Sequence, residues 1–370
     1  MKILFILHFP PPLHGPAVIG EYIKQSDLIN SRFECRYLNL SLSSSLHDIG
    51  ATNISKFFRY LKLLWDVKKQ LIFCRPDLCY VTLYSLGPGF YKDALVALIV
   101  RLFRVKTVYH FHNKGLAEYR INFFENLLYK LVFRNSEVIL ISERLYYDIE
   151  RYVSQNRVYY CTNGIPETTS KGAQDSGRWT QGVSSNFCNL LFFSNLIESK
   201  GLFILLEACK ILKDKNIDFK CVIVGGEGDI SIPMLDSRIN EMGLSKHAEY
   251  LGVKTGDEKI TIFSNADVFV HPSLSDCLPL VILEAMQHSL PVVSTIEGAI
   301  PDAVEDGVTG FIVPKKDHGA LAEKLELLII DADLRFKMGA AGRAAYERDF
   351  TLEKFENRLS EILQEAGNRR

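Results

Sequence analysis

Short apolar runs alternate with longer amphipathic stretches along almost the whole chain. The runs are rich in β-branched and aromatic residues, which favour strands. In the front half they predict strands at Lys2–Leu7, Cys35–Leu40, Leu78–Leu83, Lys106–Phe111, Glu137–Ile141 and Arg157–Cys161. In the back half they predict strands at Asn189–Phe193, Phe219–Val224, Ala248–Leu251, Val268–His271, Pro291–Ser294 and Phe311–Val313.

Helical patterns lie between these strands. The front half has them at Ile19–Ile29, Lys56–Phe73, Asp93–Phe103, Phe123–Phe133 and Glu143–Tyr152. The back half has them at Leu202–Lys215, Pro233–Met242, Asp257–Ser264, Val281–His288, Ala320–Ile330 and Asp333–Phe350. Nearly continuous apolar strands that alternate with helices are typical of parallel sheets covered on both faces. The pattern therefore predicts an α/β fold.

The length and the charge distribution indicate two domains. A chain of 370 residues is long for one α/β domain. Residues 1–166 hold 21 Lys+Arg against 13 Asp+Glu, and the remainder holds 22 against 31. Residues 167–186, rich in Ser, Gly, Thr and Gln, are predicted to link a domain at 1–166 to one at 187–350. Residues 351–370 are predicted to form a helix that packs back toward the first domain.

Cysteine usage and hydropathy bear on the cellular compartment. The eight cysteines contain no C-x-x-C pair, and several lie in apolar runs, which predicts buried, reduced thiols. The apolar run after Lys2 is too short for a signal peptide, and the run at 94–100 is too short to span a membrane. We expect a cytoplasmic protein. A net charge of -1 disfavours binding to nucleic acid.

The strongest chemical pattern follows the predicted strand Val268–His271. A loop carries Asp276, and a helix is expected to begin near Leu280, with Glu284 one turn into it. The backbone N–H groups around Cys277 and Leu278 would open this helix, where unpaired donors and the helix dipole suit a diphosphate. A helix cap at Asp276 and plain dipole compensation at Glu284 are the alternatives without a ligand.

The stretch from Asp276 to Gly310 resembles the family 4 glycosyltransferases of the GT-B fold. Their signature is a Glu, seven residues and a second Glu, followed by Ala-Met, Pro-Val-Val and D-G-x-x-G. Asp276 and Glu284 stand at the two Glu positions. The resemblance implies two Rossmann-like domains whose parallel sheets face a central cleft. It also implies retaining transfer of a hexose from a nucleotide diphosphate to a glycan or lipid-linked glycan. UDP is the expected nucleotide, because it is the usual one in the family.

The same resemblance assigns roles to residues around the expected donor. Glu284 would hold the ribose, and Asp276, shorter than Glu by one methylene, would contact the donor sugar and steady charge at the reacting carbon. Lys200 matches the cation that grips the diphosphate, while Asn195 stands where the family usually has an arginine. Leu280 would contact the donor at the start of the helix.

Other positions are matched more loosely. Gly15 matches a glycine-rich loop that lies beside the donor phosphates in the family. Gly225 matches a glycine turn beneath the nucleotide, and Leu251 stands where the base is expected to lie. A plain turn is the alternative for Gly15. The segment from Asn163 to Ile165 resembles a hinge.

Histidines end the predicted strand Lys106–Phe111. His112 is the better match to a family histidine at the sugar, and His110 and Asn113 are candidate contacts to sugar or acceptor. Alternation along a strand places His110 and His112 on one face. Simple strand-end histidines and a paired-histidine metal site are the alternatives, and the latter lacks nearby carboxylate or thiol ligands.

No metal or cofactor is expected. The D-x-D letters at Asp331–Asp333 join two predicted helices instead of following a strand. The basic, aromatic stretch Lys56–Arg75 fits either an anionic membrane surface or a helix with a core face and a solvated basic face. Two other functions stay open: a nucleotide-sugar 2-epimerase, and a non-catalytic nucleotide-sugar-binding subunit of a glycosylation complex.

Overall fold

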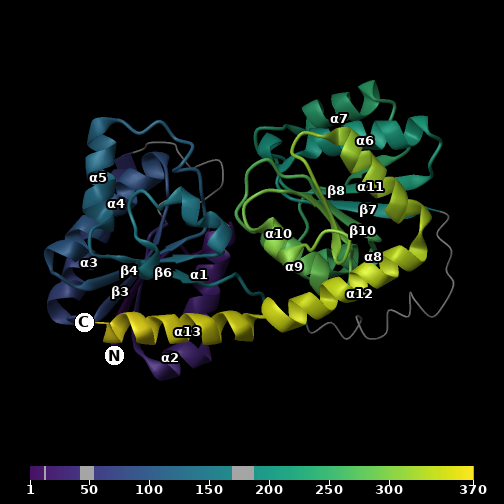
Figure 1. Cartoon of the computed structure of the whole chain (residues 1–370). Helices are drawn as coiled ribbons and strands as arrows, with labels where there is room; N and C mark the ends of the chain where they lie inside the picture. The colour runs from purple at the N-terminus through teal and green to yellow at the C-terminus, as the bar shows by residue number, and fades with distance from the viewer. Residues whose placement is uncertain (12–13, 42–53, 169–186, 370) are drawn as a thin grey trace. The chain divides into compact units, whose positions relative to one another are not determined.

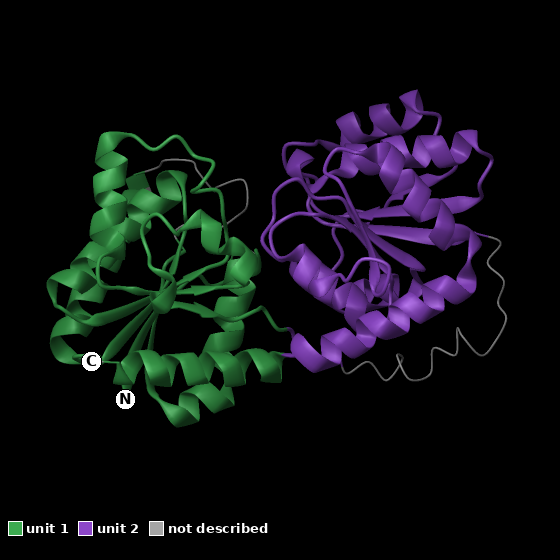
Figure 2. Cartoon of the chain, in the orientation of Figure 1, with its two compact units in different colours: residues 1–164, 352–370 green, residues 165–351 purple. Residues whose placement is uncertain are grey.

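The computed structural model describes residues 1–11, 14–41, 54–168 and 187–369. The chain forms two compact units, which Figure 2 shows in different colours. Unit 1 comprises Met1–Gly164 and Leu352–Arg370, and unit 2 comprises Ile165–Thr351. Most of the predicted linker, residues 169–186, lies outside the described residues.

Unit 1 is built on a six-stranded parallel sheet in the order β2-β1-β3-β4-β5-β6. The strands are β1 (Lys2–Leu7), β2 (Glu34–Asn39), β3 (Leu78–Leu83), β4 (Lys106–Phe111), β5 (Glu137–Leu140) and β6 (Val158–Tyr160). Its helices are α1 (Gly15–Gln25), α2 (Asp27–Arg32), α3 (Ile54–Phe73), α4 (Gly87–Leu102), α5 (Phe123–Phe133) and α13 (Leu352–Asn368), labelled in Figure 1. Every residue of β3 is buried, as a central strand covered on both faces requires.

Unit 2 has a second six-stranded parallel sheet, in the order β12-β11-β10-β7-β8-β9. The strands are β7 (Cys188–Phe193), β8 (Phe219–Val224), β9 (Ala248–Tyr250), β10 (Val268–His271), β11 (Val292–Thr295) and β12 (Gly310–Val313). The helices are α6 (Leu202–Asp214), α7 (Ile232–Glu241), α8 (Gly256–Asn265), α9 (Leu280–Gln287), α10 (Ile300–Ala303), α11 (His318–Ile330) and α12 (Ala332–Asp349).

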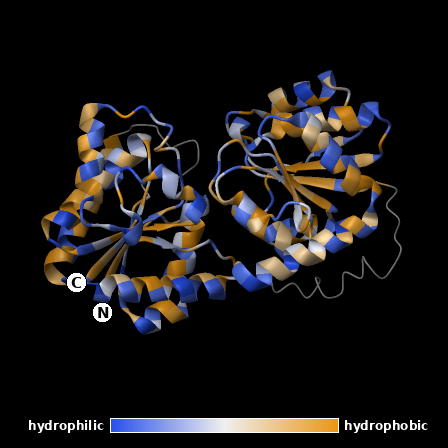
Figure 3. Cartoon of the chain, in the orientation of Figure 1, coloured by the Kyte–Doolittle hydropathy of each residue, from blue (hydrophilic) through white to orange (hydrophobic). Residues whose placement is uncertain are grey.

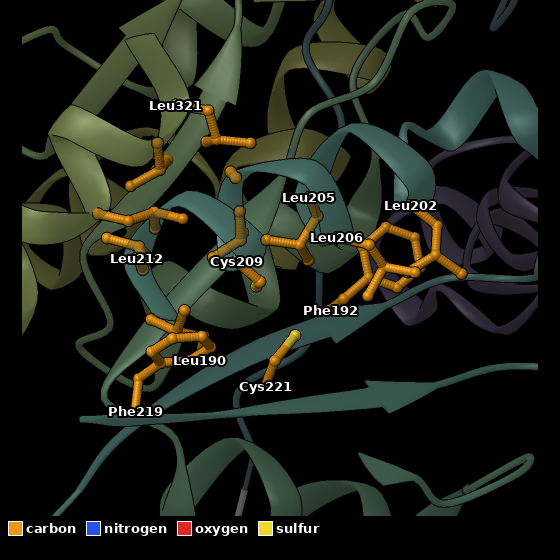
Figure 4. Close-up of a cluster of buried hydrophobic side chains, with 14 of the residues drawn as sticks. Leu190, Phe192, Leu202, Leu205, Leu206, Cys209, Leu212, Phe219, Cys221 and Leu321 are labelled. Carbon is orange, nitrogen blue, oxygen red and sulfur yellow. The ribbon is translucent and has the colours of Figure 1, made fainter. Parts of the chain in front are cut away.

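The core of unit 2 lies between its sheet and helices α6 and α11. Figure 4 shows Leu205, Cys209 and Leu212 of α6 among side chains of β7 and β8. Their spacing of three or four residues gives α6 one apolar face, which the sheet covers. Cys209 and Cys221 are free and buried here, as predicted for thiols in apolar runs.

Two predicted helices differ from the structure. The stretch Ile19–Ile29 is divided at Ser26, whose backbone is extended and whose Oγ accepts the N–H of Ile29 at 3.2 Å to cap α2. Serine competes with the helix backbone in this way at helix starts. The predicted helix Glu143–Tyr152 was wrong, because the chain forms a short 3-10 helix, Glu143–Asp148. Helix α10 was not predicted.

Helix α13 belongs to unit 1 although it follows unit 2 in the chain. Its face of Phe355, Leu359, Ile362 and Leu363 is buried, and α13 packs against α2. Arg32 Nη1 donates to Ser360 Oγ at 2.9 Å, which fixes the register of the two helices. The C-terminal segment thus completes the core of the first unit.

No helix in the described parts of the chain is long and apolar enough to cross a membrane.

Replacing Leu363 by alanine tests the packing of α13. The side chain is fully buried, so Leu363→Ala should lower the free energy of unfolding by about 2–5 kcal/mol. The matched change Leu102→Ala, at a side chain that is 80% exposed, should cost less than about 0.5 kcal/mol. Denaturant unfolding of the full chain measures both, and equal costs would contradict the packing described here.

Candidate functional site

Two loops at the carboxyl ends of β7 and β10 meet in unit 2. Leu274 N–H donates to the carbonyl of Ser199 at 2.7 Å, and Ser273 Oγ donates to the same carbonyl at 3.2 Å. Gly201 has a φ of 80°, and a Cβ at this position would lie 2.0 Å from the carbonyl oxygen of Pro272. Only glycine fits such a close left-handed turn. These contacts bring Lys200 beside Asp276.

Asp276 is the most densely bonded carboxylate of this site. Its Oδ1 lies 2.6 Å from Lys200 Nζ, and its Oδ2 accepts from Ser273 Oγ at 2.6 Å and lies 3.1 Å from His271 Nε2. Burial acts to raise the pKa of Asp276, but the hydrogen bond from His271 and the charge of Lys200 outweigh it and lower the pKa to about 2. Asp276 is therefore ionised at neutral pH.

Glu297 and Gly298, which the sequence did not single out, support Asp276 from the loop after β11. Glu297 is buried, and its carboxylate accepts the backbone N–H of Asp276 at 3.3 Å and pairs with Lys315 Nζ at 2.7 Å. Gly298 has a φ of 54°, and a Cβ there would lie 2.4 Å from the carbonyl oxygen of Asp276. The feature of the sequence that could have indicated this loop was Gly298, a glycine shortly after the end of a strand.

Glu284 forms a second lysine–carboxylate pair on α9, the helix that follows the loop of Asp276. Its Oε1 lies 2.6 Å from Lys259 Nζ, and its Oε2 is buried and has no hydrogen-bond partner among the described residues. Lys259 comes from α8 and lies 5.1 Å from the ring centroid of Phe193, at the end of β7. Lys259 was not predicted from the sequence, because a lysine on an amphipathic helix cannot be told from an ordinary solvated lysine.

Helix α9 begins as expected at Leu280, but its cap is Pro279. Asp276 lies before the cap and bonds to side chains, so it is not the N-cap, and Glu284 lies beyond the first turn. Cys277 and Leu278 are buried, and the Cys277 carbonyl accepts the N–H of Ala299 at 2.7 Å. The alternatives of a helix cap at Asp276 and of dipole compensation in the first turn by Glu284 were therefore wrong.

Asn195, Gly225 and Leu251 hold the neighbouring loops after β7, β8 and β9. Asn195 Oδ1 accepts the N–H of Gly226 at 3.3 Å. Gly225 has a φ of 152°, and a Cβ there would overlap the carbonyl of Ser194 at 1.8 Å. Leu251 donates its backbone N–H to Ile223 at 2.9 Å. Asn195 thus fixes a loop and does not replace the cation expected at its position.

In unit 1, the carboxyl ends of β1, β3 and β4 gather histidines. His8 Nδ1 lies 3.1 Å from Thr82 Oγ1, and its ring lies 5.9 Å from that of His14, centroid to centroid. Burial and the charge of Lys92 lower the pKa values of His8 and His14. Sequence reasoning missed His8, although it is the first polar residue after the first strand.

His110 lies in β4 and His112 just beyond its end, and their ring centroids lie 4.1 Å apart, as expected for side chains on one face. His110 is fully buried against Tyr80, and burial holds its pKa well below the ordinary value. Burial also lowers the pKa of His112 to about 4, although Asn163 acts in the opposite direction. Asn163, predicted only as part of a hinge, therefore contacts His112, a candidate site residue.

The remaining unit 1 candidates have local roles. Asn113 Oδ1 accepts the backbone N–H of Ser85 at 3.1 Å. Gly15 is the exposed first residue of α1, where a Cβ would meet nothing within 4 Å. Nothing in the chain itself requires glycine there. Pro12 and Leu13 of the same loop lie outside the described residues.

The D-x-D letters have a structural use. Asp331 caps α12 by accepting the N–H of Leu334 at 2.8 Å, between α11 and α12 as predicted. Within the described ranges, no three His, Cys, Asp or Glu residues lie together in a way that could hold a metal ion. Metal independence stays a prediction.

The low pKa of Asp276 predicts a pH-dependent stability. Its pKa falls from 3.8 to about 2 on folding, so the stabilisation is complete above pH 4 and is lost as the pH falls to 2. The loss amounts to about 2 kcal/mol. Asp276→Asn should lose this part of the pH dependence, whereas Asp236→Asn, at an exposed carboxylate, should keep it. Urea unfolding between pH 5 and pH 2 tests this, and parallel curves for wild type and Asp276→Asn would refute it.

The chain is similar in sequence to known proteins. Residues 178–345 match the family described as glycosyl transferases group 1. A putative colanic acid biosynthesis glycosyltransferase, WcaL of Salmonella typhimurium, is 32% identical over 47% of this chain and 44% of its own length. The capsular polysaccharide biosynthesis glycosyltransferase CapM of Staphylococcus aureus is 29% identical over 72% of this chain and 70% of its length.

Solved structures extend the likeness to both units. HepE of Anabaena, solved in complex with UDP, has a TM-score of 0.77 and 20% identity, and the match covers 99% of this chain and 100% of HepE. The chain spans less than half the length of WcaL but nearly all of HepE. These matches confirm the predicted resemblance and the predicted α/β fold, while the central cleft stays a prediction. Residues 178–345, most of unit 2, are similar to the glycosyl transferases group 1 family, and the chain as a whole has the GT-B fold.

Proposed function

We propose that this protein is a retaining glycosyltransferase that moves a hexose from a nucleotide diphosphate, UDP in particular, to a glycan or lipid-linked glycan. The observation that carries the proposal is the pairing of Lys200 with Asp276 next to Glu284 at the start of α9. Two lysine–carboxylate pairs, the second formed by Lys259 with Glu284, are thereby placed at the carboxyl edge of a parallel sheet, where ligands bind in open α/β folds.

Lys200 is the group that stabilises the leaving diphosphate in this proposal. In the structure its ammonium neutralises Asp276 at 2.6 Å. A diphosphate brings more negative charge than a carboxylate, so the flexible lysine side chain turns toward it and keeps Asp276 as a neighbour. Charge stabilisation from a group already in place is worth several kcal/mol in the transition state.

Asp276 then faces the reacting sugar as a carboxylate. Its other partners, Ser273 and His271, help to keep it fixed and ionised while Lys200 also contacts the diphosphate. A fixed negative charge favours positive charge that develops at the anomeric carbon. Glu284 contributes its buried Oε2 to the ribose hydroxyls, since this atom has acceptor capacity left beside the Lys259 contact.

The bond changes balance without a protein nucleophile. The bond from the anomeric carbon to the diphosphate breaks, and its electron pair leaves with the nucleoside diphosphate. The acceptor hydroxyl oxygen bonds to the same face of the carbon, and its proton passes to the leaving phosphate. No metal ion is part of this scheme.

We assign the acceptor side to unit 1. Its strand-end histidines have lowered pKa values, so they are neutral at pH 7 and suit hydrogen bonds to uncharged sugar hydroxyls. The colanic acid and capsular relatives support polysaccharide synthesis as the setting, and HepE with UDP supports the donor base. The free, buried thiols support a cytoplasmic place of action.

A donor panel tests the proposal. UDP-, GDP- and ADP-hexoses are added in EDTA to wild type and to Glu284→Ala, and thermal shifts and slow hydrolysis are recorded. UDP-hexoses should stabilise wild type alone, and NMR should show that the first sugar released retains its anomeric configuration. Inverted product would contradict the mechanism, whereas donor epimerisation or binding without turnover would favour the two other functions.

Loss of Lys200 should affect the rate more than the fold. Lys200→Ala should lower the turnover number for donor cleavage about a hundredfold to a thousandfold. The control Lys246→Ala removes an exposed lysine of the same unit and should leave turnover unchanged. Steady-state kinetics and thermal melts separate the two effects. A Lys200 variant with full turnover would remove Lys200 from the mechanism.

A further inference from the structure

Helices α3, α4 and α5 form one layer on the sheet of unit 1, with α4 packed against both of the others. Figure 3 shows hydrophobic segments along all three helices. Of the large apolar side chains that are exposed in the described residues, most belong to this layer and to the loops at its ends. We call the outer faces of α3, α4 and α5 the helical layer surface.

On α3 the exposed apolar residues form one stripe. The inner side of the helix, with Leu63, Val67 and Leu71, is buried. The opposite side carries Ile54, Phe57, Phe58, Leu61, Trp65 and Ile72, which recur at helical spacing. Phe58 is 63% exposed and Trp65 is 65% exposed. The predicted core face of this helix is confirmed, and the predicted solvated basic face also carries exposed apolar side chains.

Helices α4 and α5 continue the pattern. The exposed apolar residues are Tyr91, Leu95 and Leu102 on α4, and Phe123, Phe124, Leu127 and Leu131 on α5. Phe123 and Phe124 are 76% and 79% exposed. Single exposed apolar residues are ordinary on a protein surface, but stripes on three adjacent helices indicate a surface with a partner.

The charges around these stripes have one sign. Residues 54–134 contain 14 Lys+Arg and 5 Asp+Glu. Two of the five acids, Asp93 and Glu125, are buried, so they leave the surface positive. Lys62, Lys68 and Lys69 flank the stripe of α3, and Lys130 and Arg134 lie on the exposed side of α5.

The combination of charge and apolar area selects the partner. A second copy of this chain would place the same cations against one another, which is unfavourable. A bilayer with anionic head groups accepts aromatic and leucine side chains at its interface and attracts the surrounding lysines and arginines. Such a surface lies on the membrane and needs no spanning helix.

We propose that the helical layer surface docks unit 1 onto an anionic lipid bilayer. The aromatic and leucine side chains of α3 and α5 enter the interface, and the flanking cations contact the lipid head groups. This docking stands independently of the glycosyl transfer proposed above, and it would also bring the chain to acceptors held in a membrane.

Vesicle sedimentation of the full chain tests the proposal. The vesicles are phosphatidylcholine alone, or equal parts of phosphatidylcholine and phosphatidylglycerol. One variant carries Phe58→Ser and Trp65→Ser on α3, and another carries Phe124→Ser and Leu127→Ser on α5. The matched control carries Ile330→Ser and Phe336→Ser, which are exposed apolar residues of unit 2.

Wild type and control should bind the phosphatidylglycerol vesicles, and each double variant should bind them at least about tenfold more weakly. A third variant with Lys62, Lys68 and Lys69 changed to glutamine should bind them more weakly at low salt, and its deficit should shrink as salt is added. Unchanged thermal melts of the exposed-site variants show that folding is preserved.

Other results would overturn the docking. Wild type that binds neither kind of vesicle contradicts it, as does a control that loses as much binding as the double variants. Wild type that dimerises through this surface, with dimers abolished by Phe58→Ser and Trp65→Ser and with no vesicle binding, assigns the surface to a second copy. Light scattering at several protein concentrations detects that case.

Discussion

The arrangement of unit 2 depends on keeping Asp276 ionised although it is largely removed from water. Burial alone would favour the neutral acid, so the carboxylate needs Lys200, His271 and Ser273 around it. Each of these partners comes from a strand end or the loop after it, and the loops approach closely only because Gly201 has no Cβ. The charge of Asp276 therefore depends on the backbone geometry of two loops, because their close approach at Gly201 brings its partners into place.

The same principle recurs around the neighbouring carboxylates. Glu284 pairs with Lys259 and Glu297 pairs with Lys315, so each negative group has its own lysine. An incoming anion can share the lysine of such a pair, and Asp276 also has Ser273 and His271 as partners, so its buried charge is not left alone. The proposed binding and release of a highly charged diphosphate would make use of such internal counter-ions.

Unit 1 uses different chemistry on a similar sheet. Its strand ends carry histidines whose pKa values are lowered mainly by burial, so these side chains are uncharged at neutral pH. Its charge lies instead on the outer helices α3 and α5, beside exposed aromatic residues. The basic front half seen in the sequence is thus concentrated at the surface and away from the strand ends. Two domains of one architecture therefore present chemically different surfaces.

The sequence by itself determined the α/β pattern, nearly every strand, and the positions of Asp276, Glu284 and Lys200, because apolar periodicity and motif spacing are local properties. It could not determine which side chains meet. Glu297 and Lys259 are remote from Asp276 and Glu284 in sequence and become partners only when the strands assemble. Asn195 resembled an incomplete cation site until the fold gave it the N–H of Gly226. The outer face of α3 was decided by the tertiary structure as well, since only packing against the sheet fixes which apolar side chains remain exposed.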